Sequence, residues 1–214
     1  MTGFRPLLPR RTVLALSCAG AVAVALPMTA SAQDAVTHVL DNGLTVIIKP
    51  MPSNPMVSVY GLIKAGGATE GKYLGSGLSH FLEHMLFKGT EHHGVGEIGR
   101  SVQAAGGSIN ALTSFDYTIF TITVPKESFE IAVDLLADAL FHSSLDAGEI
   151  EKERKVVFGE MRLRKDNPDV YLNDLIFRSA YLNHPYKHPV IGYPDVFAKS
   201  TRDDLLDFYK TFYI

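Results

Sequence analysis

Two histidines and one glutamate stand at spacings that suit metal-assisted chemistry in the stretch His80-Phe81-Leu82-Glu83-His84. On a helix, His80 and His84 are one turn apart on the same face, so both imidazoles can bind one metal ion. Neutral histidine nitrogen is a preferred zinc ligand, and zinc lowers the pKa of its bound water to about 7. Glu83 projects from the same side and can accept a proton from that water. The pattern H-x-x-E-H therefore predicts zinc-dependent peptide hydrolysis with Glu83 as the general base.

A catalytic zinc also needs a third protein ligand and an open coordination position. The charged segment 149–165 offers Glu153 and Glu160, which are seven residues apart. Seven residues make two helical turns, so both carboxylates face one direction. One can bind zinc while the other holds a ligand histidine. Taken alone, such a segment is also typical of a solvated helix with ion pairs between successive turns.

Three stretches, residues 77–90, 106–111 and 153–161, together resemble the pitrilysin and insulysin type of zinc metallopeptidase, the inverzincins. Within that family they are most similar to bacterial members like the mitochondrial processing peptidase. Their order and spacing both fit, and the likeness extends over essentially everything after residue 35. The resemblance implies an α+β fold, in which helices pack on one side of an antiparallel sheet.

The resemblance also assigns roles to the residues of the site. It implies His80, His84 and Glu160 as ligands of one zinc ion per chain, and Glu153 as a glutamate that supports the catalytic site. Glu83 keeps the role of base that its position in the motif already predicts. For the segment around Glu153 and Glu160, the resemblance therefore favours a role in the metal site over an ordinary solvated helix.

Asn110 and Ala111 are the expected substrate contacts. In the family, their strand is a sheet edge near the zinc, and the peptide substrate adds to it as one more strand. Taken alone, residues 106–111 are typical of a turn that enters a strand. Family members continue beyond the equivalent of Ile214 into a second domain. We therefore expect an incomplete N-terminal metallopeptidase domain at residues 33–214, completed by a second half or a partner subunit.

Four of the six histidines outside the motif lie close together in pairs and are not expected to bind metal. His92 and His93 are adjacent on a predicted loop and share no helix face with the motif, so we expect them to be exposed to solvent. His184 and His188 have helical spacing, but a proline follows each of them and prevents a helix through both.

Apolar periodicity and turn residues predict the elements that position these side chains. The turn Asp41-Asn42-Gly43 indicates a hairpin, and Asp146 is the expected cap of the helix that carries Glu153 and Glu160. Besides that helix and the one that carries the motif, we expect helices at 95–104, 127–141, 170–181 and 202–212. Strands are expected at 36–40, 44–49, 56–64, 108–114 and 117–124.

Residues 1–32 have the composition of a bacterial signal peptide. Arg5, Arg10 and Arg11 precede an apolar stretch, and Ala30-Ser31-Ala32 offers a cleavage site. The arginine pair also fits a twin-arginine export signal. The alternative is an uncleaved anchor helix, for which the apolar run is short. We expect a periplasmic or secreted protein without a stable membrane span after cleavage.

Cleavage after residue 32 would remove three arginines and no acid, so the formal charge would change from −3 to −6. No basic patch remains that would indicate a nucleic-acid partner. The single cysteine, Cys18, would also be lost, so any zinc must be bound by histidine and carboxylate.

Two functions are compatible with these features. The first is a zinc metalloendopeptidase that hydrolyses unfolded peptides or short oligopeptides. The second is a non-catalytic peptide-binding or assembly subunit that keeps the metal motif but is inactive without a partner half. The presence of Glu83 beside a full set of ligands favours the first, because binding alone does not need a base. A plain zinc-storage protein would not need Glu83 either.

Overall fold

The computed structural model describes residues 35–214, which fall into two compact units. The first unit is Met1–Met51, of which a β-hairpin is described, and the second is Pro52–Ile214. The signal peptide expected at residues 1–32, with its arginine pair and Cys18, lies outside the described residues. The expected domain limits of 33–214 stay a prediction.

The hairpin of the first unit consists of β1 (Val36–Val39) and β2 (Thr45–Ile48), which pair antiparallel with Val36 opposite Ile48. At its turn, the Leu44 N–H donates to Asn42 Oδ1 at 3.1 Å, and Gly43 has a φ of +88° that favours glycine. The structure thus confirms the predicted hairpin, with strands one and two residues shorter than expected.

The second unit is built on a three-stranded antiparallel sheet of order β3-β5-β4. Its strands are β3 (Met56–Ile63), β4 (Ser108–Thr113) and β5 (Thr118–Pro125). In the central strand β5, every second side chain from Thr118 to Val124 is fully buried, which places one face of the sheet against the core. Within the described residues β4 pairs only with β5, so it is an edge strand.

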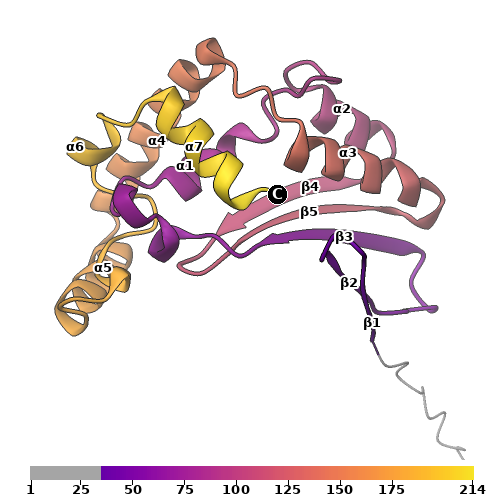
Figure 1. The fold of residues 1–214 in the computed structure, drawn as a ribbon, viewed down its shortest axis with the longest axis horizontal. Coiled ribbons are helices and arrows are strands. Elements are labelled where there is room, and N and C mark those ends of the chain that lie inside the picture. The colour runs from indigo at the N-terminus through magenta and orange to yellow at the C-terminus, as the bar shows by residue number, and fades with distance from the viewer. Residues whose placement is uncertain (1–34) are drawn as a thin grey trace, which may run out of the picture. The chain divides into compact units, whose positions relative to one another are not determined.

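Three helices lie on one face of this sheet (Figure 1): α1 (Leu78–Met85), α2 (Glu97–Ala104) and α3 (Phe129–Phe141). Helix α3 contacts β3 and β5, and α1 and α2 contact β4. Helix α3 lies close to Gly61 in β3, where a Cβ atom would lie 2.5 Å from the end of the Leu140 side chain, at Cδ1. These contacts confirm the α+β fold, with helices packed on one side of an antiparallel sheet.

The long helix predicted in the charged segment is α4, and its Asp146 cap is confirmed, because Asp146 Oδ1 accepts the N–H groups of Gly148 and Glu149 at 2.8 and 3.0 Å. The other helices are α5, α6 and α7. In chain order the four span Ala147–Asp166, Pro168–Ala180, Pro194–Phe197 and Arg202–Phe212. Four 3₁₀ turns lie at Gly67–Thr69, Gly71–Tyr73, Lys126–Ser128 and Pro185–Lys187. The last of these begins at the proline after His184, so no helix runs through His184 and His188.

Helix α5 differs from the other long helices because none of its side chains is buried. Phe177 stacks on Phe115 with ring centroids 5.0 Å apart, and Arg164 of α4 pairs with Asp174 at 3.5 Å. The helix projects from the unit (Figure 1) and has exposed apolar side chains at Tyr171, Leu172, Leu175 and Ile176. It is therefore held by a few aromatic and ionic contacts rather than by a core.

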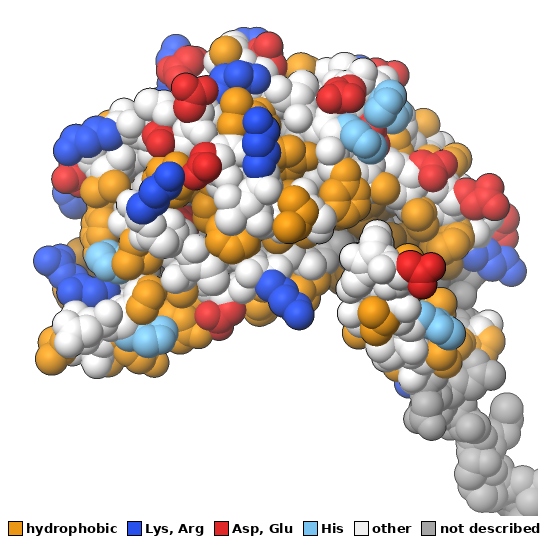
Figure 2. Space-filling model, viewed as in Figure 1, with side chains coloured by type: hydrophobic (Ala, Val, Ile, Leu, Met, Phe, Trp, Pro, Cys, Tyr) orange, Lys and Arg blue, Asp and Glu red, His pale blue; other side chains and the backbone are white. Residues whose placement is uncertain are grey.

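The hydrophobic core of the second unit lies between the sheet and the helices. Its largest members, each at most 2% exposed, include Phe81, Phe120, Phe197 and Phe208. On the visible surface, basic and acidic side chains are interspersed without a large basic patch among the coloured residues (Figure 2). No helix within residues 35–214 combines the length and the apolar character that a membrane crossing requires.

Candidate metal centre

Helix α1 carries the H-x-x-E-H motif, and its apolar face is packed in the core. Its apolar side chains point into the core and are at most 1% exposed: Leu78, Phe81, Leu82 and Met85. The side chains of His80 and His84 lie at the border of this face, 18% and 16% exposed. Because the apolar stripe fixes the rotation of the helix, both imidazoles face α4.

The start of α1 is fixed by Glu70, a residue that sequence reasoning missed. This carboxylate is buried, and it accepts the N–H and hydroxyl of Ser79 at 3.0 and 2.8 Å and the N–H of Gly77 at 3.2 Å. Gly77 has a φ of +74°, and a Cβ atom there would lie 2.1 Å from the carbonyl oxygen of Ile191. An acid at the N-terminus of a helix satisfies its unpaired N–H groups. The motif is thus anchored from outside its own helix.

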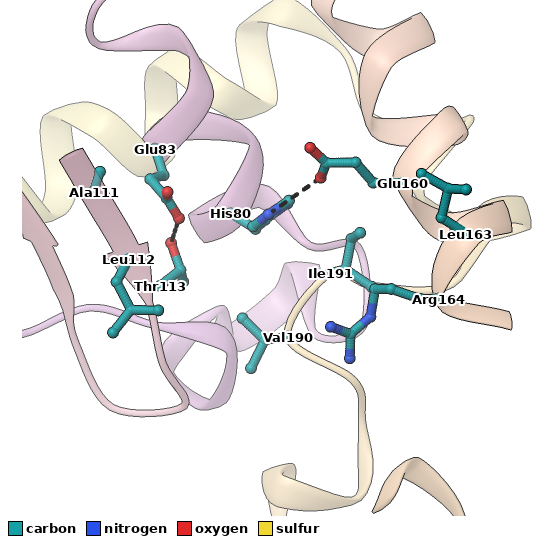
Figure 3. A pocket seen from close by; sticks show the side chains of 10 residues that line it. All are labelled: His80, Glu83, Ala111, Leu112, Thr113, Glu160, Leu163, Arg164, Val190 and Ile191. Atoms are coloured by element: carbon teal, nitrogen blue, oxygen red, sulfur yellow. Dashed lines mark hydrogen bonds and ion pairs between the residues drawn. The ribbon is translucent and has the colours of Figure 1, made fainter. Parts of the chain in front are cut away.

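Glu160 of α4 meets both motif histidines. Its Oε2 atom lies 3.7 Å from His80 Nε2 and 3.5 Å from His84 Nε2, and the three potential ligand atoms lie within 4.8 Å of one another. Figure 3 shows the Glu160 carboxylate directed at the His80 ring. The structure therefore brings together the three residues expected to bind zinc.

Glu153, two turns before Glu160, contacts the other side of the His84 ring. His84 Nδ1 lies 2.8 Å from Glu153 Oε1, and Lys88 Nζ lies 2.7 Å from Glu153 Oε2. Burial alone would raise the pKa of Glu153, but Lys88 and His84 lower it below its ordinary value. This carboxylate is ionised and holds His84 with Nε2 directed at Glu160, the arrangement that orients metal-binding histidines.

The candidate base Glu83 faces the same space and is held by Thr113 of β4. The Thr113 hydroxyl donates to Glu83 Oε2 at 2.5 Å (Figure 3). Burial raises the pKa of Glu83, and the hydrogen bond from Thr113 opposes part of that rise. A carboxylate with a raised pKa accepts a proton more readily near neutral pH. Thr113 was not predicted, although its position two residues after Ala111 places it on the same face of the strand.

The three candidate ligands fit a zinc ion. Burial, and then the neighbouring His84 and Arg164, lower the pKa of His80 to about 3, so its imidazole is neutral and can donate a lone pair. Two zinc ligands at about 2.05 Å in tetrahedral geometry stand about 3.3 Å apart, close to the separations of Glu160 Oε2 from the two Nε2 atoms. No cysteine lies within residues 35–214, so the donor set of two imidazoles and one carboxylate is the one that catalytic zinc sites use.

Two cavities meet at Glu83, along the edge strand β4. One of about 370 Å³ is lined by His80, Glu83, Glu160 and residues 111–113, and one of about 300 Å³ by Glu83, His84, Lys88 and residues 109–111. Ala111 therefore lines both cavities. Asn110 lines only the second, and its side chain is exposed on the strand position that alternates with Ala111. Their expected role in substrate binding stays a prediction.

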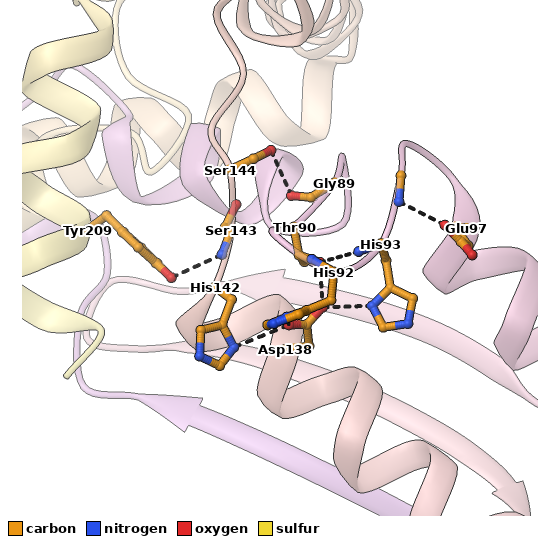
Figure 4. A network of polar contacts seen from close by, with 11 residues as sticks. Gly89, Thr90, His92, His93, Glu97, Asp138, His142, Ser143, Ser144 and Tyr209 are labelled. Carbon is orange, nitrogen blue, oxygen red and sulfur yellow. Dashed lines mark hydrogen bonds and ion pairs between the residues drawn. The ribbon is translucent and has the colours of Figure 1, made fainter.

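The expectation that both histidines are exposed to solvent is confirmed for His92, which is 60% exposed, and wrong for His93, which is 28% exposed. Both rings approach Asp138 of α3 (Figure 4), with Nδ1 atoms 2.5 and 2.7 Å from its carboxylate oxygens. Asp138 is 45 and more residues away in the chain, so the sequence held no local signal of this contact. By contrast, His184 and His188 belong to no group of potential metal ligands within residues 35–214.

Comparisons with a family model and with curated proteins point to the same family of zinc proteases. Residues 45–193 match the family model of insulinase, peptidase family M16. The chain is 35% identical over 176 residues to an uncharacterized zinc protease, YmxG, of Bacillus subtilis (strain 168), covering 82% of this chain and 43% of that protein. It is also 35% identical over 178 residues to the zinc protease PqqE of Helicobacter pylori (strain ATCC 700392 / 26695), covering 81% of this chain and 39% of that protein.

Among solved structures, a protease from Helicobacter pylori superposes with a TM-score of 0.80 at 32% identity, covering 84% of this chain and 44% of that chain. This likeness agrees with the packing described above. The chain spans about two fifths of the length of the curated relatives it matches.

Proposed function

The chain belongs to the insulinase family of peptidases, M16, whose curated relatives are named zinc proteases. From this premise we propose that it is the catalytic part of a zinc-dependent metalloendopeptidase that hydrolyses unfolded peptides or short oligopeptides. The observation that carries the proposal is the convergence of His80, His84 and Glu160 beside Glu83, at the meeting of two cavities.

In this proposal His80, His84 and Glu160 hold one zinc ion, which when bound polarises the scissile carbonyl and acidifies water. Glu83 accepts the proton of the attacking water and returns it to the leaving amine, and the Thr113 hydroxyl holds its carboxylate in place. Glu153 does not touch the reacting atoms. It positions His84, and its charge is balanced by Lys88.

The substrate peptide is proposed to extend the sheet at β4. Within residues 35–214 the outer side of β4 pairs with no other strand, and it lies beside both cavities. Backbone pairing would give affinity that tolerates many sequences, while the side chains that line the cavities would give selectivity. Asn110 and Ala111 are the proposed contacts on this strand.

The rest of the substrate-binding surface is proposed to come from a second half of the protein or from a partner subunit. The relatives are more than twice as long as the region that this chain matches. We also propose that the protein is exported, because residues 1–32 have the features of a signal peptide. A periplasmic or secreted location follows from that proposal.

The test is cleavage of a quenched peptide library by the zinc-loaded chain, compared with Glu83→Gln and with Glu151→Gln as a matched control. Glu151 lies on α4 and is exposed, so its replacement removes a carboxylate away from the site. We expect cleavage by the parent and the control, and none by Glu83→Gln with an unchanged zinc content.

Zinc bound by all three proteins without cleavage by any would contradict catalysis by this chain and favour the non-catalytic peptide-binding function. Equal cleavage by the parent and Glu83→Gln would refute the role of Glu83 as base.

A further inference from the structure

A second cluster of metal-ligating side chains lies away from the candidate metal centre, where the loop after α1 meets the C-terminal end of α3 (Figure 4). Asp138, in the last turn of α3, is its centre. We propose that His92, Asp138 and His142 bind a second divalent transition-metal ion of the zinc class. This inference does not rest on the proposed peptidase function.

The geometry around Asp138 converges on one carboxylate oxygen. Asp138 Oδ1 lies 2.5 Å from His92 Nδ1 and 3.2 Å from His142 Nδ1, and the two rings meet edge to face with centroids 5.2 Å apart. The ligand atoms of the three residues lie within 4.8 Å of one another. His142 follows Asp138 by four residues at the end of a helix, so the two side chains form a natural chelating pair.

The other carboxylate oxygen is already engaged. Asp138 Oδ2 accepts the Thr90 hydroxyl and lies 2.7 Å from His93 Nδ1. Thr90 and His93 therefore fix the rotation of the carboxylate and leave Oδ1 directed at His92 and His142 (Figure 4). His93 is a positioning residue in this arrangement and not a ligand.

The distances require only small movements to admit an ion. Two ligand atoms in tetrahedral zinc geometry stand about 3.3 Å apart, close to the 3.2 Å that separates His142 Nδ1 from Asp138 Oδ1. His92 Nδ1 must withdraw by less than about 1 Å on the same criterion, and its side chain is 60% exposed on a loop. To bind an ion through Nδ1, each neutral ring carries its proton on Nε2 instead, so the ion takes the place of the Nδ1 protons that point at Oδ1.

Charge and exposure also suit a metal ion. The Asp138 side chain is 10% exposed, whereas His92 and His142 are half-exposed, so the carboxylate is sheltered and an ion can enter from solvent past the two rings. The carboxylate brings a negative charge to the site, between two imidazole rings.

The donor set selects the class of ion. Imidazole nitrogen suits Zn²⁺, Ni²⁺ and Cu²⁺, whereas Mg²⁺ and Ca²⁺ prefer sites made of oxygen ligands. An ion at this place would connect the loop at His92 to α3. The same two segments already meet in a bridge between Thr90 and Ser143, in which the Glu91 N–H donates to the His142 carbonyl. The ion would therefore act as a clamp on a contact that exists without it.

The experiment measures zinc per chain by elemental analysis after equilibrium dialysis at micromolar free zinc. The test variant is His92→Gln/His142→Gln, which leaves Asp138 and its bond from Thr90 in place. The matched control is His38→Gln/His184→Gln, which removes two exposed histidines outside both clusters. A third protein, His80→Gln/His84→Gln, reports the candidate metal centre separately.

We expect two zinc ions for the parent and the control, and one for each of the other two variants. A His92→Gln/His142→Gln protein that holds as much zinc as the parent would overturn the proposal, as would an equal loss in the control. If only the His80→Gln/His84→Gln protein loses an ion, the candidate metal centre stands and the second site fails.

A local measurement separates metal binding from a general loss of structure. In the parent, zinc is expected to slow amide hydrogen exchange in residues 90–94, and this effect should be absent from His92→Gln/His142→Gln while exchange in the strands is unchanged. Exchange in residues 90–94 that does not respond to zinc in the parent would also overturn the proposal.

Discussion

Replacement of Glu70 by glutamine probes the buried carboxylate that anchors the metal-binding helix. Glu70 is 3% exposed and accepts hydrogen bonds from Ser76, Gly77 and Ser79. Glutamine has the same size, but it carries no charge and turns one acceptor oxygen into an N–H₂ group. The comparison of the two side chains therefore isolates the effect of ionising this carboxyl group.

The magnitude follows from the pKa of Glu70, which burial raises from 4.5 to about 7 although the hydrogen bonds from Ser79, Gly77 and Ser76 oppose the rise. Between these pH values the folded chain keeps a proton that the unfolded chain has lost. The free energy of unfolding contributed by Glu70 is therefore fully present below pH 4.5 and is lost as the pH rises through 7. At about 1.4 kcal/mol per pKa unit the loss is about 3 kcal/mol.

The assay is urea unfolding of the parent and Glu70→Gln between pH 5 and pH 8, with a chelator present so that metal binding does not contribute. Other titrating groups are common to both proteins, so the difference between their free energies of unfolding reports Glu70. We expect this difference to shift by about 2 to 3 kcal/mol in favour of Glu70→Gln as the pH rises. Glu127→Gln, on an exposed turn, controls for the loss of charge alone.

A difference that is independent of pH, or that moves in favour of the parent, would refute this reasoning. It would mean that the donors around Glu70 stabilise the anion at least as much as burial destabilises it.

Two further predictions concern the positioning of the site. Gly77→Ala should destabilise the chain far more than Gly71→Ala, as measured by urea midpoints, because a Cβ atom on Gly77 would collide with a backbone carbonyl oxygen while that on Gly71 meets nothing within 4 Å. Gly71→Ala should cost only about 1 to 2 kcal/mol for its left-handed backbone, and equal losses would contradict the collision. Glu153→Gln should weaken zinc binding about 10- to 100-fold in a competition with a chelator, whereas Glu151→Gln should leave it unchanged; an unaltered affinity for Glu153→Gln would show that His84 does not depend on this carboxylate.

The parts of the structure that the sequence predicted are those that local periodicity determines. His80 and His84 face one way because a helix repeats every 3.6 residues, and the same rule places Glu153 and Glu160 on one side of α4. The turn at Asn42 and Gly43 likewise follows from the left-handed backbone that a tight hairpin requires. That α1 packs beside α4 was predicted from the family resemblance, because the spacing of residues within one helix does not determine which helix it contacts.

The parts that the sequence did not predict are contacts between segments far apart in the chain. Glu70 lies before α1 in the chain, and the residues next to it in the sequence do not indicate that it is buried. Thr113 reaches Glu83 only because β4 packs beside α1. His93 was expected to be exposed to solvent, because its partner Asp138 is provided by α3 and not by its own loop. Such side chains are positioned by tertiary packing, which the periodicity of a single helix or strand does not predict.

The sparse anchoring of α5 has a consequence for motion. Local opening costs least where few apolar groups are buried, so α5 should unfold and refold many times for each opening of its neighbour α4. The two helices are separated only by Asn167, which is the last cap of α4 and the first cap of α5. The expected lifetime of the folded helix therefore changes across a single residue. Beyond that point, backbone amides should exchange with solvent on a shorter timescale than those beside Glu160.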